Sequence, residues 1–399
     1  MATGRTSAAF DFSKGVCMFK NRSTFRFAAL ALAAALVGCA HQSIGMAPAA
    51  PAVAAVPQVQ RQALAQGLYE LAYSPRQNAV YVASSGGFGA TAGPSQVLKL
   101  DPKTLAVQAA IPLERKGFGI ALDDAAGRLY VGNTVDTSVT VVDLASGKPV
   151  GTVQLMQKVT GKDGKQRYSH DLRELVVDAA QNRLYVTGHS FEGSVLFVVD
   201  TKTLQVVKTI EGLGKTKAPG LVLDAAGARV FTSNLFGEIL VIDTHKLEVV
   251  RRIQTEIEQP MNLVYDASSK RLFATDQGLP MIRGMQEKLH TGFQSSHPGN
   301  RVAVVDVDSG KLVHSIPTAA GPLALLLDPR GQRLYVTERS AGSVSVFDAR
   351  SYQRLSTAEL SGLPNSLALD PRDQTLYVSI KSGEKEPKGS AESVARVQF

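Results

Sequence analysis

The chain has 399 residues, of which 44% are hydrophobic and 20% are charged, and its mean hydropathy is zero. This composition is typical of a globular protein with enough apolar residues for a core, and it excludes a largely disordered or fibrous chain. The formal net charge is +8, but residues 1–38 hold five basic residues and one acidic residue. The mild positive excess of the remaining chain supports weak steering of polyanions and excludes a dedicated phosphate-tracking surface.

The N-terminus has the pattern of a secretory signal. Lys20, Arg22 and Arg26 precede an apolar run over 27–37, which is too short to span a bilayer as a stable helix. The run ends in Leu-Val-Gly-Cys, which resembles the lipobox of bacterial lipoproteins. We therefore expect residues 1–38 to be a signal peptide and Cys39 to be lipidated. Two alternatives stay open: an ordinary cleaved signal with an unmodified cysteine, and translation that starts at Met18.

Residues 39–57 are rich in Ala and Pro and carry almost no charge. Such a segment forms a semi-extended tether of about 3 Å per residue, which would hold the following domain away from a membrane. The two cysteines, Cys17 and Cys39, both precede that domain. The folded body therefore contains no disulfide.

Residues 58–399 contain a repeat of about 40 to 50 residues, and residues 321–348 are its clearest copy. Each copy has short apolar runs that end in turn residues, as expected for strands. The centre of the second run occurs seven times, at 80–83, 129–132, 184–187, 230–233, 272–275, 334–337 and 376–379. Four strands per repeat at this spacing are typical of a β-propeller. The sequence therefore predicts an all-β, seven-bladed propeller of four-stranded antiparallel blades.

The last repeat supplies only three strands, the third of which ends at Phe399. The alternating stretch Val59–Leu64 precedes the first repeat and is not used by it. We expect this stretch to be the missing outer strand of blade 7. It would join both chain ends in one sheet and remove the open edge of the ring.

The first strands are expected to end at Ser74, Asp123, Asp178, Asp224, Asp266, Asp328 and Asp370. Their spacing reveals two insertions, one over 156–171 before the first strand of blade 3 and one over 277–301 between the second and third strands of blade 5. Consecutive strands are antiparallel, so both insertions should lie on the face where the central channel opens. Long loops on a rigid scaffold often carry binding sites.

Side-chain alternation along the first strands predicts which residues line the channel. Three positions before each strand end the residue is Leu or Ile, which predicts packing between blades. Four positions before the end, near the mouth, are Glu70, Gly119, Glu174, Gly220, Asn262, Ala324 and Ser366. Two carboxylates and an amide could hold a divalent cation or a polar ligand, although no metal is assigned. Alternatively, Glu174 pairs with its neighbour Arg173.

The loops after the second strands add a polar surface on the same face, formed by Asn133, His189, Asn234, Asp276, Arg339 and Lys381. The blade 3 insertion and the next blade junction supply basic residues around an aromatic one: Lys158, Lys162, Lys165, Arg167, Tyr168, Lys215 and Lys217. Such a set can clamp a single-stranded backbone and stack a base, and the alternative is a solvated loop. No catalytic residue is assigned, because the repeats contain no nucleophile elbow, Gly-rich phosphate loop or Cys/His pair.

The segments 131–135 and 334–338 resemble the YVTN propellers. Closer resemblance is to the YncE-type periplasmic proteins of Gram-negative bacteria, at 67–74 (GLYELAYS), 173–176 (RELV), 344–352 (VSVFDARSY) and 364–369 (PNSLAL). The similarity covers about residues 58–399. The resemblance implies a secreted propeller that binds single-stranded DNA and has a link to iron. It implies no established catalysis. This chain departs from the family in having no Trp, so stacking would fall to Tyr168 or Phe118, and in the longer blade 5 insertion.

These observations favour a non-enzymatic, monomeric binding propeller in the periplasm. A lipid anchor would be its only attachment to the outer membrane. Its ligand or protein partner is not named by the sequence, and single-stranded DNA is one candidate. A propeller lactonase with a carboxylate or metal site at the channel mouth is the alternative enzyme. A scaffold that docks onto an outer-membrane receptor is the third hypothesis. The fold does not choose among them, because propellers host unrelated activities.

Overall fold

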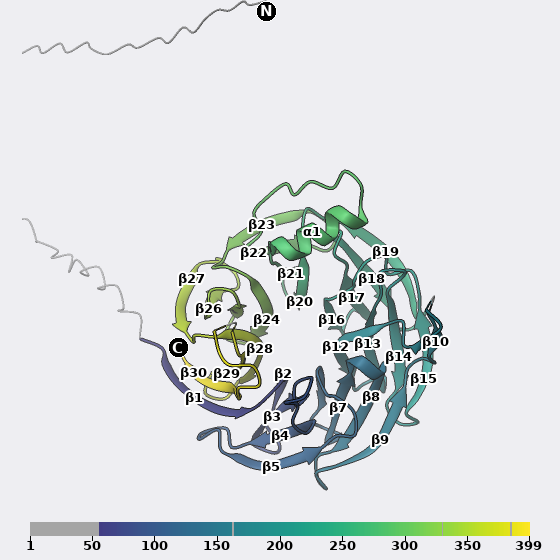
Figure 1. Ribbon diagram of the computed structural model, residues 1–399. Helices are drawn as coiled ribbons and strands as arrows, with labels where there is room; N and C mark the ends of the chain where they lie inside the picture. Colours follow the sequence, from purple (N-terminus) through teal and green to yellow (C-terminus); the bar gives the residue numbers. More distant parts are fainter. Residues whose placement is uncertain (1–55, 162, 329, 384) are drawn as a thin grey trace, which may run out of the picture. The chain divides into compact units, whose positions relative to one another are not determined.

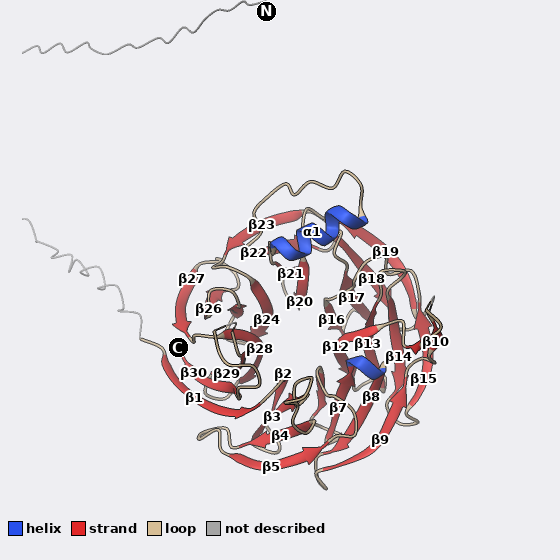
Figure 2. Ribbon diagram, in the orientation of Figure 1, coloured by secondary structure: helices blue, strands red, loops and turns tan. Residues whose placement is uncertain are grey.

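The computed structural model describes residues 56–399 apart from 162, 329 and 384. The predictions for residues 1–38, for Cys39 and for the tether as far as residue 55 lie outside the described residues. The described residues form one compact unit, in which seven four-stranded antiparallel sheets surround a central axis (Figure 1). Strands dominate this unit, as Figure 2 shows. The predicted seven-bladed, all-β propeller is confirmed.

The first three blades follow the chain from the inner strand to the outer one. Blade 1 consists of β2 (Leu68–Ser74), β3 (Ala79–Ser84), β4 (Gln96–Leu100) and β5 (Val107–Pro112). Blade 2 consists of β6 (Ile120–Asp123), β7 (Arg128–Asn133), β8 (Ser138–Asp143) and β9 (Lys148–Gln154), with the short 3-10 helix η1 (Thr134–Asp136) after β7. Blade 3 consists of β12 (Asp171–Asp178), β13 (Arg183–His189), β14 (Val195–Asp200) and β15 (Gln205–Ile210).

The next three blades have the same order. Blade 4 consists of β16 (Leu221–Asp224), β17 (Arg229–Ser233), β18 (Glu238–Asp243) and β19 (Glu248–Gln254). Blade 5 consists of β20 (Pro260–Asp266), β21 (Arg271–Asp276), β22 (Arg301–Asp306) and β23 (Leu312–Pro317). Blade 6 consists of β24 (Pro322–Asp328), β25 (Arg333–Glu338), β26 (Ser343–Asp348) and β27 (Arg354–Glu359). All seven first strands end at the residues that the sequence predicted.

Blade 7 is built from both ends of the propeller chain. Its strands are β28 (Leu363–Asp370), β29 (Thr375–Lys381), β30 (Glu392–Gln398) and the outer strand β1 (Gln58–Ala65). β1 and β30 are antiparallel, with Gln58 opposite Gln398 and Arg61 opposite Ala395. In Figure 1 the purple strand β1 lies beside the yellow strand β30. The predicted closure of the ring is therefore confirmed.

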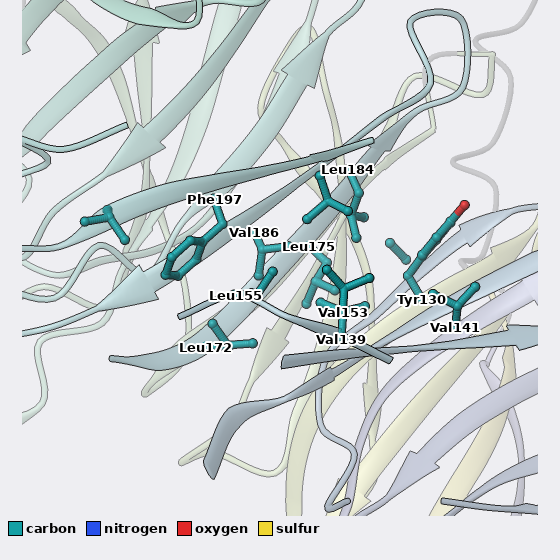
Figure 3. Close-up of a cluster of buried hydrophobic side chains, with 13 residues drawn as sticks. Tyr130, Val139, Val141, Val153, Leu155, Leu172, Leu175, Leu184, Val186 and Phe197 are labelled. Atoms are coloured by element: carbon teal, nitrogen blue, oxygen red, sulfur yellow. The ribbon is translucent and has the colours of Figure 1, made fainter. Parts of the chain in front are cut away.

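Neighbouring blades are held together by apolar side chains between their sheets. Figure 3 shows the cluster between blades 2 and 3, to which blade 2 contributes Tyr130 and Val141 and blade 3 contributes Leu175, Val186 and Phe197. All five side chains are buried. The residues three positions before each first-strand end are likewise buried, from Leu263 at 3% exposure to Leu367 at 9%. This is the packing role that the sequence predicted for them.

The repeated aspartates at the ends of third strands are turn residues. Asp200, for example, accepts hydrogen bonds from the amides of Lys202 and Thr203, both at 2.9 Å. Asp243 does the same with His245 and Lys246, both at 2.8 Å. An aspartate that bonds the backbone two and three residues ahead stabilises a tight turn. These aspartates therefore recur among the repeats because each stabilises a turn, and their recurrence does not indicate a functional site.

The two insertions have different structures. Residues 156–171 contain the small hairpin of β10 (Val159–Thr160) and β11 (Gln166–Arg167), which lies at the outer rim of the ring in Figure 1. Residues 277–301 contain the helix α1 (Pro280–Leu289), which lies over one face of blade 5. None of the helices in the described part of the chain has the length and apolar character needed to span a membrane.

Candidate ligand site at the channel mouth

A cavity of about 690 Å³ occupies the mouth of the central channel. The first strands of all seven blades surround this axis, so residues at equivalent positions form rings around it. Of the ring four positions before the strand ends, six members line the cavity: Glu70, Gly119, Glu174, Asn262, Ala324 and Ser366. Arg173 lines it as well. The structure therefore brings the predicted mouth residues together at this cavity, with the exception of Gly220.

A second ring of side chains also lines this cavity, and strict alternation along the strands did not predict it. Its members lie five positions before the strand ends: Tyr69, Phe118, Arg173, Met261, Leu323 and Asn365. The register of the first and second strands shifts at this point in blades 1, 3, 5, 6 and 7. Such β-bulges re-aim side chains and occur next to functional sites. The bulges explain why two consecutive positions both reach the cavity.

Gly119 lies between Glu70 and Glu174 in the ring order. A Cβ atom at Gly119 would come within 2.6 Å of the carbonyl oxygen of Arg173 and 3.3 Å of the Glu70 carboxyl, so blade 2 has no room for a side chain here. Glu70 Oε2 accepts a hydrogen bond from the amide of Ile120 at 2.8 Å. Each carboxyl therefore belongs to the inner wall of the ring, with the glycine between them.

Glu174 bonds to side chains on both of its sides. Its Oε1 accepts hydrogen bonds from Asn262 Nδ2 at 3.0 Å and from Arg173 Nε at 3.4 Å. Asn262 Oδ1 in turn accepts from the amide of Leu325 at 2.9 Å. Gly220 of blade 4 lies between Glu174 and Asn262 in the ring order and carries no side chain. The pairing of Glu174 with Arg173, one of the two predicted alternatives, is thus present in the structure.

The electrostatics of the carboxyl pair favour protonation of one of its two members. Burial raises the pKa of Glu70 well above its ordinary value, and the nearby carboxylate of Glu174 raises it further. Burial also raises the pKa of Glu174, whereas Arg173 and Asn262 oppose that change. Two neighbouring, largely buried carboxyl groups rarely ionise together. We therefore expect Glu70 to hold the proton and Glu174 to carry the charge.

Three basic side chains line the cavity: Arg173, Lys217 and Arg339. Among the residues that the structure describes, Lys217 and Arg339 form no salt bridge. The Lys217 ammonium lies 5.3 Å from the ring centre of Phe191, which holds it in place without neutralising its charge. Arg339 Nη1 donates to Asn365 Oδ1 at 2.5 Å. Burial lowers the pKa of Arg339 and repulsion by Arg173 adds to this effect, whereas Glu392 and Tyr69 oppose it.

His189 lies among these cations. It lines the cavity, is 8% exposed, and its Nδ1 atom has no hydrogen-bond partner among the described residues. Burial lowers the pKa of His189 to about 3, and the charges of Arg173 and Lys217 contribute. The ring is therefore neutral near pH 7. A neutral imidazole beside two cations can accept or donate one hydrogen bond to a ligand.

Lys381 lies beside the cavity without lining it. Its Nζ donates to the Leu68 carbonyl at 2.8 Å and to Glu392 Oε2 at 2.9 Å, and it lies 3.8 Å from the ring centre of Tyr69. Tyr69 itself packs edge-on against Phe118, with ring centres 4.6 Å apart. Lys381 therefore supports the aromatic side of the cavity and is already neutralised by Glu392.

Three residues of the predicted polar surface are instead buried at or next to the ends of second strands. Asn133, Asn234 and Asp276 are buried, with at most 1% exposure. Asn133 Oδ1 accepts from Thr140 Oγ1 at 2.8 Å, and Asn234 Nδ2 donates to Glu238 Oε2 at 2.6 Å. Asp276 accepts from Arg301 Nε at 3.0 Å. These contacts occur because the end of a second strand lies between blades, where polar groups must bond internally.

The basic residues predicted for nucleic-acid contact are divided between two places. Lys158, Lys165 and Arg167 are exposed on the β10–β11 hairpin, and the Lys158 ammonium lies 5.3 Å from the ring centre of Tyr168. Lys215 is exposed at the junction of blades 3 and 4, whereas Lys217 lines the cavity. Lys162 lies outside the described residues. The sequence grouped all of these residues, but the hairpin carries its share away from the channel mouth.

The blade 5 insertion forms an apolar wall of the cavity through Leu279, Met281 and Ile282. Gln286 fixes the helix, because its Nε2 donates to the carbonyl oxygens of Leu235 and Glu258, both at 2.7 Å. The sequence placed this insertion on the mouth face but did not predict its helix. Among the described residues, no group of three or more His, Cys, Asp or Glu side chains is arranged to hold a metal ion.

Fold and cavity together define a class of protein, a seven-bladed propeller with a polar and apolar cavity at one end of its channel. No family model matches the chain. It is 34% identical over 301 residues to the protein YncE of Salmonella typhimurium, covering 74% of this chain and 78% of the relative. It is 33% identical over 279 residues to YncE of Escherichia coli K12, covering 69% and 71%. The chain belongs to the YncE family.

A solved structure supports the fold alone. Hydrazine synthase of Kuenenia stuttgartiensis superposes with a TM-score of 0.62 at 17% sequence identity, covering 79% of this chain and 92% of that chain. At this identity the similarity shows a shared propeller architecture. Function must be argued from the residues of the cavity.

Proposed function

We propose that this protein is a non-enzymatic binding protein of the periplasm that captures a small anionic ligand in the channel mouth, with Cys39 as its lipid anchor. The supporting observation is the cavity of about 690 Å³ with three basic side chains, two of which have no salt bridge among the described residues. Small-molecule sites usually have this size and combine apolar walls with a few convergent polar groups. An anion between these side chains would relieve their mutual repulsion.

Binding is favoured over catalysis because the carboxyl groups of Glu70 and Glu174 already form hydrogen bonds between blades. Glu70 bonds the backbone of blade 2 through Ile120, and Glu174 bonds Asn262 of blade 5. Both contacts connect one blade with another, which is a structural role. The basic residues at the mouth have fewer internal partners and are the groups available to a ligand.

Thermal unfolding in the presence of simple anions tests the proposal. Inorganic phosphate, sulfate and organic carboxylates are added at constant ionic strength, and a saturable rise in the midpoint is expected for at least one of them. Lys217→Gln and Arg339→Gln should abolish the rise. Lys208→Gln is the matched control, because Lys208 is exposed on the outer strand β15. The proposal fails if no anion produces a saturable rise.

Single-stranded DNA is a second candidate, favoured by the position of Lys158 over Tyr168 on the exposed hairpin. A base could stack on the ring while the lysine contacts the backbone. Fluorescence titration with labelled oligonucleotides at low and moderate salt tests it, and Tyr168→Ala should weaken binding. Absence of binding at low salt rejects this candidate.

A lactonase is the third candidate, and the raised pKa of the Glu70 carboxyl favours it. A carboxyl that stays protonated near neutral pH can act as a general acid. Metal content after gentle purification and turnover of a panel of lactones test it, with activity expected to disappear in Glu70→Gln and Glu174→Gln. Protein that turns over none of the lactones, with or without added divalent metal, rejects this candidate.

A further inference from the structure

The walls of the mouth cavity differ in chemistry, and this difference restricts the class of ligand. Blade 3 and its junction with blade 4 supply Arg173, His189 and Lys217. Blade 5 supplies the apolar side chains of Met261, Leu279, Met281 and Ile282. A small ligand that contacts both walls must combine a charged end with an apolar body.

The charge of the cavity suits one negative charge. Its lining includes three basic residues, Arg173, Lys217 and Arg339, and three acidic ones, Glu70, Asp171 and Glu174. With Glu70 protonated, as burial and Glu174 favour, three positive charges face two negative ones. One positive charge remains, which matches a monoanion better than a dianion. A second negative charge would lie near Glu174 and Asp171 without a cation to balance it.

A buried polar atom points to a missing hydrogen bond on the basic wall. His189 is 8% exposed and its Nδ1 atom has no partner among the described residues. Thr216, next to Lys217, is 2% exposed, and its Oγ1 atom also has no hydrogen-bond partner among the described residues. Buried polar side-chain atoms in native proteins are nearly always hydrogen-bonded, so a partner from a ligand is expected at His189.

The apolar wall contains a side chain that the core does not use. Met281 lines the cavity from the first turn of α1 and is 81% exposed. Ile282, the next residue, is buried at 8% exposure and packs the helix onto the propeller. A flexible Met side chain at the lip of a cavity adapts to apolar ligands of different shape.

We infer that the cavity binds a small organic monocarboxylate with an apolar body. Its carboxylate lies between Arg173, Lys217 and Arg339, and its hydrocarbon part lies against Met281 and Ile282. Guanidinium groups bind carboxylates in a planar, two-point geometry, and this geometry favours a carboxylate over a spherical anion. The inference rests on the proposed function and adds the chemical class of the ligand.

Isothermal titration calorimetry with four probes tests the inference: cinnamate, its uncharged amide, acetate and phenyl phosphate. Cinnamate should bind, whereas the amide, which lacks the charge, and acetate, which lacks the apolar body, should each bind at least about tenfold more weakly. Phenyl phosphate, a dianion near neutral pH, should also bind more weakly than cinnamate.

Variants locate the binding. Lys217→Gln and Arg339→Gln should weaken cinnamate by about tenfold, and Met281→Ser should weaken cinnamate while leaving acetate unchanged. Lys208→Gln should behave like the wild type. The thermal midpoint of each ligand-free variant shows that it is folded, and Lys217, which is half-buried and donates no hydrogen bond that the structure records, can be replaced with little effect on the fold.

The outcomes separate the two proposals. If phenyl phosphate binds and cinnamate does not, or if the amide binds as well as cinnamate, the inference is overturned. The first of these results leaves the proposed function standing. If no anion binds, both are overturned. Cinnamate binding that survives both Lys217→Gln and Arg339→Gln places the ligand elsewhere and also overturns the inference.

Discussion

His189 should make the stability of the propeller sensitive to acid. Burial, together with the charges of Arg173 and Lys217, lowers the pKa of His189 from 6.5 to about 3. Below the higher value the unfolded chain binds a proton that the folded chain does not, so stability present above pH 6.5 is lost as the pH falls toward 3. Each pH unit in this window is worth about 1.4 kcal/mol, so acidification from about pH 7 to about pH 5 should cost about 2 kcal/mol.

Replacement of His189 by Gln should remove this cost. The free energy of unfolding is measured by urea titration at both pH values for the wild type, His189→Gln and His245→Gln. His245 is exposed in the turn after β18, so its replacement should retain the wild-type response. Glu70 and Glu174 have raised pKa values and change stability in the opposite direction, but all three proteins share them. If His189→Gln loses as much stability as the wild type, the burial argument is wrong.

Three further predictions concern the propeller itself. Glu70→Gln keeps an acceptor for the Ile120 amide and removes a carboxyl that burial keeps protonated in the folded chain but that ionises in the unfolded chain. At about pH 8 this variant should therefore be more stable than the wild type by on the order of 1 kcal/mol, an advantage that shrinks toward about pH 4.5; equal urea midpoints at both pH values would contradict this. A chain without residues 58–65 should lose the outer strand of blade 7, and with it the hydrogen bond from Arg61 to the Leu360 carbonyl. Its thermal midpoint should fall, and it should aggregate through the free edge of β30. A chain that begins at Gln58 is the control. Gln286→Ala leaves the carbonyl oxygens of Leu235 and Glu258 without this donor and should lower the free energy of unfolding by about 2 kcal/mol. It should also speed proteolysis over 277–301. Lys288→Ala, on the exposed face of the same helix, should change neither quantity.

The sequence was sufficient for the blades because the information that specifies them is local. Each strand is marked by a short apolar run, and many of the turns by an aspartate or glycine, so the strand ends could be counted residue by residue. Counting from those ends also identified Glu70, Glu174 and Asn262 as neighbours in space, since equivalent positions in a closed ring approach the same axis. The closure by β1 followed from the missing strand of the last repeat.

Only the tertiary structure decided which polar residues belong to the cavity. His189 and Asn133 both end second strands, yet His189 lines the cavity and Asn133 bonds to Thr140 of the neighbouring strand β8. The β-bulges that turn Tyr69 and Asn365 toward the axis arise from the pairing of two strands and from contacts between blades, so neither chain segment shows them by itself. The helix α1 is fixed by Gln286 through carbonyl groups up to 51 residues away. Local pattern fixes the strands because each strand's apolar face is written in its own residues, whereas the cavity is formed by side chains from different blades, and their contacts exist only once the ring has closed.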